Sequence, residues 1–153
     1  MNRNYFNNHI TSTLQKSITS TLLFLLITYI STAQTYKGSD LYYMGSCRIT
    51  GDTAYFSKIE SSDIYYLSEA IWEKKTTLLK FVKEDDLYFL GRALILKDKA
   101  ELEKIKADDW FYFGTALMQD NIDFLANIQN NNVYILGKSI IEKDKDLLEK
   151  IVD

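Results

Sequence analysis

The chain has 153 residues and a formal net charge of −3, with one histidine, one cysteine and no proline. The histidine, His9, lies in a segment that we expect to be cleaved. Without an imidazole the remaining chain lacks His-based triads, His-ligated zinc and the commonest general base. A single cysteine excludes an internal disulfide, and a net acidic chain without a basic cluster is a poor match for nucleic acid or an anionic membrane surface.

Residues 1–33 are predicted to form a cleavable secretory signal. They carry two basic residues and no acidic one, then the apolar run TLLFLLITYI, and end with the small residues Ser31 and Ala33 at positions −3 and −1. The alternative is a transmembrane anchor, but about 20 predominantly apolar residues are needed to span a bilayer. We therefore expect export to the periplasm, cell surface or extracellular space, no stable membrane insertion after cleavage, and a short linker over 34–39.

From residue 40 the chain repeats itself every 23 residues without insertion or deletion. An acidic or amide residue opens an aromatic segment in each copy, and the segments read DLYYMG, DIYYLS, DLYFLG, DWFYFG and NVYILG. One such unit cannot bury its apolar face alone, whereas stacked copies can. We expect one repeat domain over 40–153, divided into 40–62, 63–85, 86–108, 109–131 and 132–153.

The first half of each repeat is predicted to be a β-hairpin. Short runs of aromatic and β-branched residues favour strands, and a small residue follows each run, where glycine can take the positive φ of a tight turn. This column holds Gly45, Ser68, Gly91, Gly114 and Gly137. The second arm of the hairpin ends in the apolar column of Ile49, Trp72, Ile95, Met118 and Ile141.

The second half of each repeat has a helical pattern. Leu102 and Ile105 are three apart, and Asp98 before them can cap a helix N-terminus, with Glu101 completing a capping box. The capping position of three other repeats holds Asp52, Asn121 and Asp144, whereas Lys75 breaks the pattern. Because helices this short are marginal in water alone, we expect their apolar residues to form one buried spine. The spine comprises Leu79, Leu102, Leu125 and Leu148 with Val82, Ile105, Ile128 and Ile151.

These two halves predict a fold of the α+β class, rich in β structure. Five tandem 23-residue repeats, each a β-hairpin followed by a short helix or helical turn, would stack into one domain. The stretch VKEDDLYFL leaves a second interpretation open, because the apolar residue before the turn also fits an extended strand. The unit would then be closer to a three-stranded meander, and periodicity does not separate the two.

The stretch NNNVYILGKSI, Asn130–Ile140, resembles the DKNYY family of bacterial repeat proteins. In that family an Asp/Asn-rich turn precedes a Val-Tyr-Tyr strand, which is followed by Gly-Lys and an apolar arm. EDDLYFLGRAL and SSDIYYLSEAI are weaker copies of this pattern, and the resemblance extends over Asp40–Asp153. It implies an exported repeat protein without established enzymatic activity, and it supplies no catalytic residue.

Reactive side chains are few, and each has a structural interpretation. Cys47 belongs to a column of small residues, Cys47, Ala70, Ala93, Ala116 and Ser139, which indicates close packing. Glu84–Asp86 and Asp108–Asp109 could form a calcium site or the acid/base pair of a glycan hydrolase, but the equivalent residues elsewhere are types that turns favour. We predict no metal, cofactor or catalytic residue, and keep a carboxylate-dependent hydrolase of envelope glycans as the alternative.

The aromatic columns are the candidate binding device. Regularly spaced rings can stack on sugar faces, although they can equally form the core of the repeats. Because strands alternate faces, we expect the fourth column, Tyr43, Tyr66, Phe89, Tyr112 and Ile135, to face the core. The third column, Tyr42, Tyr65, Tyr88, Phe111 and Tyr134, is then the candidate contact face. The predicted function is a non-enzymatic exported module that binds a protein or surface glycan, or has a structural role.

Cleavage is predicted between Ala33 and Gln34, because of the small residues before this bond and the short apolar run. Mass spectrometry of the exported protein measures the new N-terminus. A mature chain that retains TLLFLLITYI would contradict both the export prediction and the loss of the histidine.

Overall fold

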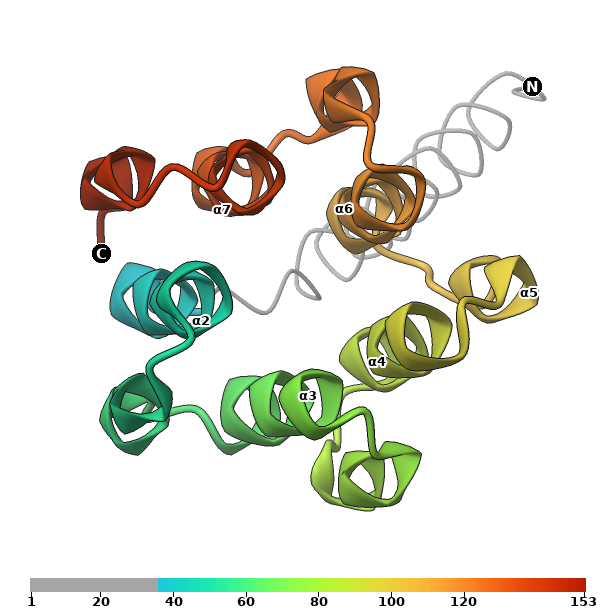
Figure 1. Ribbon diagram of the computed structural model, residues 1–153. Coiled ribbons are helices and arrows are strands. Elements are labelled where there is room, and N and C mark those ends of the chain that lie inside the picture. Colours follow the sequence, from blue (N-terminus) through green and yellow to red (C-terminus); the bar gives the residue numbers. More distant parts are fainter. Residues whose placement is uncertain (1–35) are drawn as a thin grey trace, which may run out of the picture. The chain divides into compact units, whose positions relative to one another are not determined.

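The computed structural model describes residues 36–153, and this part of the chain is built from alternating long and short helices (Figure 1). The long helices are α2 (Gly38–Thr50), α3 (Ser62–Glu73), α4 (Asp85–Leu96), α6 (Asp108–Gln119) and α7 (Asn131–Glu142). The short ones are η1 (Thr53–Lys58), η2 (Thr76–Phe81), α5 (Lys99–Leu102), η3 (Ile122–Asn127) and η4 (Asp146–Lys150). The predicted signal, its cleavage site and the first linker residues lie outside the described part.

The predicted β-hairpins are wrong, and so is the β-rich α+β fold class. Tyr36–Asp153 contains no strand, and each segment predicted as two arms and a turn is one long helix. Its buried residues are spaced by three, as in Ile64, Leu67 and Ala70, which is a helical period. Strand propensity is a weak guide because burial and packing override it, and this explains the error.

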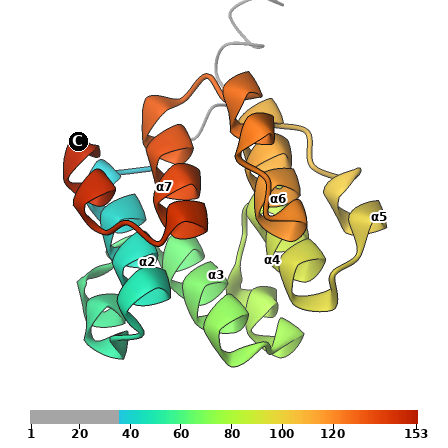
Figure 2. The same ribbon diagram turned by 45° about the horizontal axis from the view of Figure 1, so that its top comes forward.

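The five long helices stand in a ring, with the short helices on its outer side (Figures 1 and 2). Each long helix packs against the next, and α7 packs against α2, so that the ring is closed. Each short helix packs on the long helix that precedes it. The domain is therefore a closed array of helical hairpins.

An aspartate near the start of each of the first four long helices binds the chain where the next repeat begins. Asp86 Oδ1 accepts the Lys106 N–H at 2.9 Å, and its Oδ2 accepts the Ala107 N–H at 2.8 Å. Asp40, Asp63 and Asp109 make the same pair of bonds, always to the residues 20 and 21 positions on. We call this contact the aspartate clamp. The turn-forming role expected from the sequence is thus replaced by a bond from the start of one long helix to the segment that leads into the next.

The glycine column allows close packing inside helices and forms no turn. A Cβ on Gly91 would lie 2.6 Å from Leu79 Cδ2, much closer than a real Cβ contact. The same leucine position meets Gly114, Gly137 and Gly45. Among the described glycines only Gly51, after α2, has a positive φ. The small side chain is needed because the short helix of one repeat packs directly on the long helix of the next.

A leucine–glycine contact and a hydrogen bond close the ring. A Cβ on Gly45 would lie 2.7 Å from Cδ2 of Leu148, in the last repeat. The Ser39 N–H at the start of α2 donates to Asp153 Oδ1 at 2.8 Å. Asp153 lies one 23-residue period after Asn130, whose side chain caps α7 by accepting hydrogen bonds from the Asn132 and Val133 N–H groups. The last repeat thus supplies α2 with the capping acceptor that its own N-cap residue lacks.

The predictions for the second half of each repeat agree with the structure better than those for the first half. Four capping residues accept the expected backbone N–H: Asp52, Asp98, Asn121 and Asp144. Lys75 makes no cap bond. Glu101 pairs with Arg92 and Lys104 and does not complete the predicted capping box. The spine leucines are buried with Val82 and Ile105, whereas Ile128 and Ile151 are half-buried.

Replacing Asp86 with alanine should destabilise the domain by about 1–3 kcal/mol, because two backbone N–H groups lose their acceptor. The free energy of unfolding, measured by urea titration, tests this. Asp85→Ala is the matched control, since Asp85 lies in the same first turn of α4 but is exposed and makes no side-chain bond in the described structure. Equal urea midpoints for the two variants would contradict the clamp.

Candidate functional site

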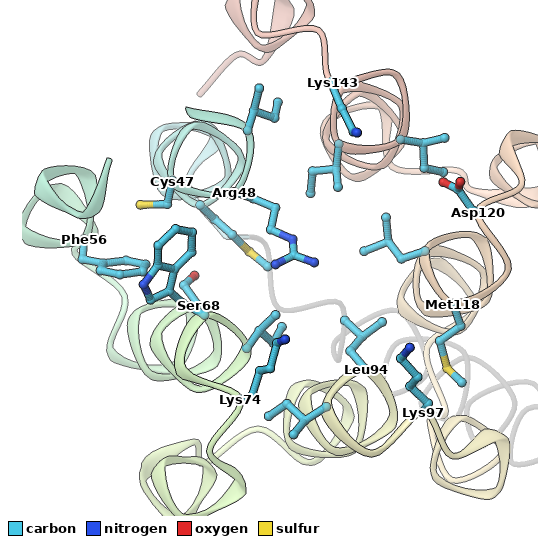
Figure 3. Close-up of a pocket in the computed structure, with 18 residues that line it drawn as sticks. Cys47, Arg48, Phe56, Ser68, Lys74, Leu94, Lys97, Met118, Asp120 and Lys143 are labelled. Atoms are coloured by element: carbon cyan, nitrogen blue, oxygen red, sulfur yellow. The ribbon is translucent and has the colours of Figure 1, made fainter. Parts of the chain in front are cut away.

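A cavity of about 820 Å³ lies in the middle of the ring, and the last turns of all five long helices line it (Figure 3). One turn earlier in these helices the ring interior is packed. Leu67, Leu90, Phe113 and Leu136 there have no exposed surface, and Met44, their equivalent in the first repeat, is nearly buried and lines the cavity. The cavity therefore has a filled floor and is open at the C-terminal ends of the helices.

Two adjacent positions of the repeat line the cavity. One is the apolar column of Ile49, Trp72, Ile95, Met118 and Ile141, and the other is the position before it, here called the wall. Four copies are aliphatic, and the first copy is Arg48, which points from α2 toward the middle of the ring in Figure 3. The aliphatic members are Ile71, Leu94, Leu117 and Ile140, all half-buried. A guanidinium thus interrupts an otherwise apolar wall at one place.

The rim is formed by the residue that follows four of the five long helices. Lys74, Lys97 and Lys143, here called the mouth lysines, and Asp120 line the cavity with φ between 50° and 55°. Glycine is the usual residue in this left-handed conformation, and Gly51 has it in the first repeat. A side chain there costs about 1–2 kcal/mol, and lysine is not among the types that tolerate it well. Retained backbone strain of this kind points to a use for the side chain.

The opening is cationic in an acidic domain. Arg48 and the mouth lysines face a single lining carboxylate, Asp120. Over residues 36–153, sixteen basic residues stand against twenty-one acidic ones, a net charge of −5. None of these four cations forms an ion pair within the described residues. Helix C-termini attract cations, and Arg48, which is exposed in the last turn of α2, and the mouth lysines all lie at such ends.

The predicted aromatic contact face does not contribute to this cavity. The third and fourth columns are both half-buried in the first four repeats, and of their ten members only Ile135 is buried. The expected difference in burial between the two columns is therefore absent in these four repeats. The two rings of each pair meet edge-on in these repeats. Tyr42 donates to Glu149 at 3.0 Å and Tyr65 to Glu69 at 3.4 Å. These contacts describe packing, and binding at Tyr42, Tyr65, Tyr88, Phe111 and Tyr134 stays a prediction.

Three of the five carboxylates considered for chemistry have structural partners. Asp86 and Asp109 form clamps, and Glu84 caps α4 by accepting the Leu87 N–H at 2.7 Å. Burial raises the pKa of the Glu84 carboxyl. Within Tyr36–Asp153 no three His, Cys, Asp or Glu side chains come together as metal ligands could.

The sequence indicated the apolar column and Cys47, which line the cavity, but neither the wall position nor the mouth lysines. The mouth lysines recur in the 23-residue register, two residues after the apolar column predicted to end a strand. Arg48 was visible as the one charged residue in a column of aliphatic ones. Once that segment is recognised as a helix, both signals indicate residues that share one end of the ring.

Comparisons with known proteins give no family assignment: no family model, curated protein or solved structure matches the chain. The resemblance to the DKNYY family therefore rests on its quoted residues alone. Every helix between Tyr36 and Asp153 is too short or too polar to cross a bilayer.

Cys47 should react slowly with a thiol reagent in the folded protein. It is 3% exposed, and burial, reinforced by the charge of Asp52, raises its pKa to about 11. At pH 8 on the order of a thousandth of such thiols are ionised, and the thiolate is the reactive form. The rate of alkylation at pH 8 should rise by about a hundredfold or more in denaturing urea. Equal rates in the two conditions would contradict the buried position.

Proposed function

We propose that the chain is an exported, non-enzymatic module whose ring of helices binds a small, partly apolar molecule in its central cavity. The observation that carries this proposal is the cavity itself. Its volume of about 820 Å³ lies within the roughly 300–1,000 Å³ of small-molecule sites. Such sites combine an apolar wall with a few polar groups, and here the aliphatic column and the cationic opening supply both.

The composition of the cavity favours binding over catalysis. Among residues 36–153 Asp120 is the only carboxylate that lines it, whereas glycoside hydrolysis requires two opposed carboxyl groups. Cys47 lines the cavity but is buried and has a raised pKa, which disfavours its nucleophilic form. The hydrolase alternative has no support from these side chains.

Two earlier hypotheses continue as part of the proposal. Export rests on the sequence of residues 1–33, which lie outside the described structure. Binding of a protein or a surface polymer remains compatible with the cavity, provided that the partner inserts a narrow apolar group into it. The partner then contacts the wall and the rim, and the outer aromatic columns are not required.

Filling the cavity tests this function. Calorimetric titration of the full chain with octanol and with sodium octanoate should show saturable binding of at least one of the two, at one molecule per chain. Leu94→Trp places a large ring in the wall and should weaken that binding at least tenfold. The matched control is Leu96→Trp, in the same helix, because Leu96 is 50% exposed and does not line the cavity.

Folding of both variants is verified by circular dichroism and by the midpoint of urea unfolding. Binding of neither compound to the unmodified chain would contradict the proposed function. So would an equal loss of affinity in the Leu94 and Leu96 variants, since binding would then lie elsewhere.

A further inference from the structure

We infer, on the basis of the proposed function, that the ligand is an amphipathic anion. Its head is an oxyanion, a carboxylate or a phosphate, held by Arg48 with the mouth lysines around it. Its aliphatic part lies against the apolar wall of Ile71, Leu94, Leu117 and Ile140. This assigns a chemical class to the cavity and a specificity role to Arg48.

The position of Arg48 is the first observation that indicates an anionic ligand. The other four repeats show that an aliphatic side chain fits at this place in the wall. Arginine instead presents a planar fork of donors that matches the two oxygens of a carboxylate or phosphate. Arg48 is exposed, its guanidinium points into the middle of the ring (Figure 3), and it has no ion-pair partner within the described residues. It is therefore available to an anion that enters between the helices.

The rim carries the second step. The mouth lysines hold positive charge around the opening from three different repeats, and each does so in a strained backbone conformation. The domain as a whole is acidic, so an anion is repelled by most of the surface and attracted at this opening. Asp120 is the one lining side chain that opposes the anion. The charge pattern thus selects for a negative head group.

The helix dipoles offer a competing explanation for the same cations. Each long helix ends at the opening, and its C-terminus carries about −0.5 elementary charge. If the cations served only to offset these dipoles, their removal would lower stability and leave the ligand preference unchanged. Ligand preference and stability must therefore be measured on the same variants.

The experiment uses four probes with one chain length. Octanoate, octyl phosphate, octanol and octylammonium are titrated into the full chain by calorimetry, and acetate serves as a head group without a chain. We expect octanoate or octyl phosphate to bind at least tenfold more tightly than octanol, octylammonium to bind more weakly than octanol, and acetate to give no measurable heat. The stronger of the two anions distinguishes a carboxylate from a phosphate ligand. Among the probes that bind, added salt should weaken the binding of the anions only.

Substitutions then assign the head-group site. Arg48→Leu restores the aliphatic wall, and it should remove the preference for the anion while leaving octanol binding equal or tighter. Lys97→Gln should lower the affinity for the anion about two- to fivefold. Lys99→Gln is its matched control. Lys99 carries the same charge and lies two residues further along the chain, but its side chain is exposed and does not line the cavity. Urea midpoints of the variants separate binding effects from a role in stability.

The outcomes distinguish this inference from the proposed function. If octanol binds as tightly as both anions, the cavity still takes up ligands, but the anionic class is wrong. An anion preference that survives Arg48→Leu overturns the role of Arg48. If none of the chain-bearing probes binds, the proposed function itself fails.

Discussion

The structure depends on one interaction, the pair of hydrogen bonds by which an aspartate carboxylate near the start of a long helix holds two backbone N–H groups at the end of its own repeat, just before the next long helix. The partners are always 20 and 21 residues further along, so the intervening short helix and turns must have a fixed length. Insertion or deletion of one residue in this segment would move both N–H groups away from the carboxylate. This explains why five copies keep a period of 23 residues without insertion or deletion. In the last copy Asn132 replaces the acid and both donates to and accepts from Val152.

The cavity follows from closure of the ring. Helical repeats commonly stack into open arrays whose terminal repeats need a polar cap, and such an array has no enclosed interior. Here α2 and α7 are in contact, and Leu148 packs on Gly45 as Leu79 packs on Gly91. Five helices whose C-termini meet at one end therefore surround a common space. Small residues inside the helices keep neighbouring repeats close, and the wall and rim positions decide what enters.

The sequence predicted the second half of each repeat better than the first. Asp98 and its equivalents signal helix starts by a local mechanism, and a leucine three residues before an isoleucine fits a single turn. The first half failed because Tyr, Phe and Ile favour strands in isolation, whereas the spacing of Ile64, Leu67 and Ala70 is visible only if the run is treated as a helix. The partners of Asp86 lie 20 and 21 residues away, beyond a short helix, and the four cations of the opening meet only when the ring is closed. Neither follows from local pattern.

The contact between Asp153 and the first turn of α2 has a topological consequence. The passage from the fifth repeat to the first uses the capping and leucine–glycine contacts of the other junctions, and it does so without a peptide bond. The chain order of the repeats is therefore not encoded in the geometry of the ring. A circular permutant whose backbone begins at α4 would present the same wall and the same opening. In such an arrangement a repeat could change its cavity-facing residue independently of its neighbours, as the first repeat has done with Arg48.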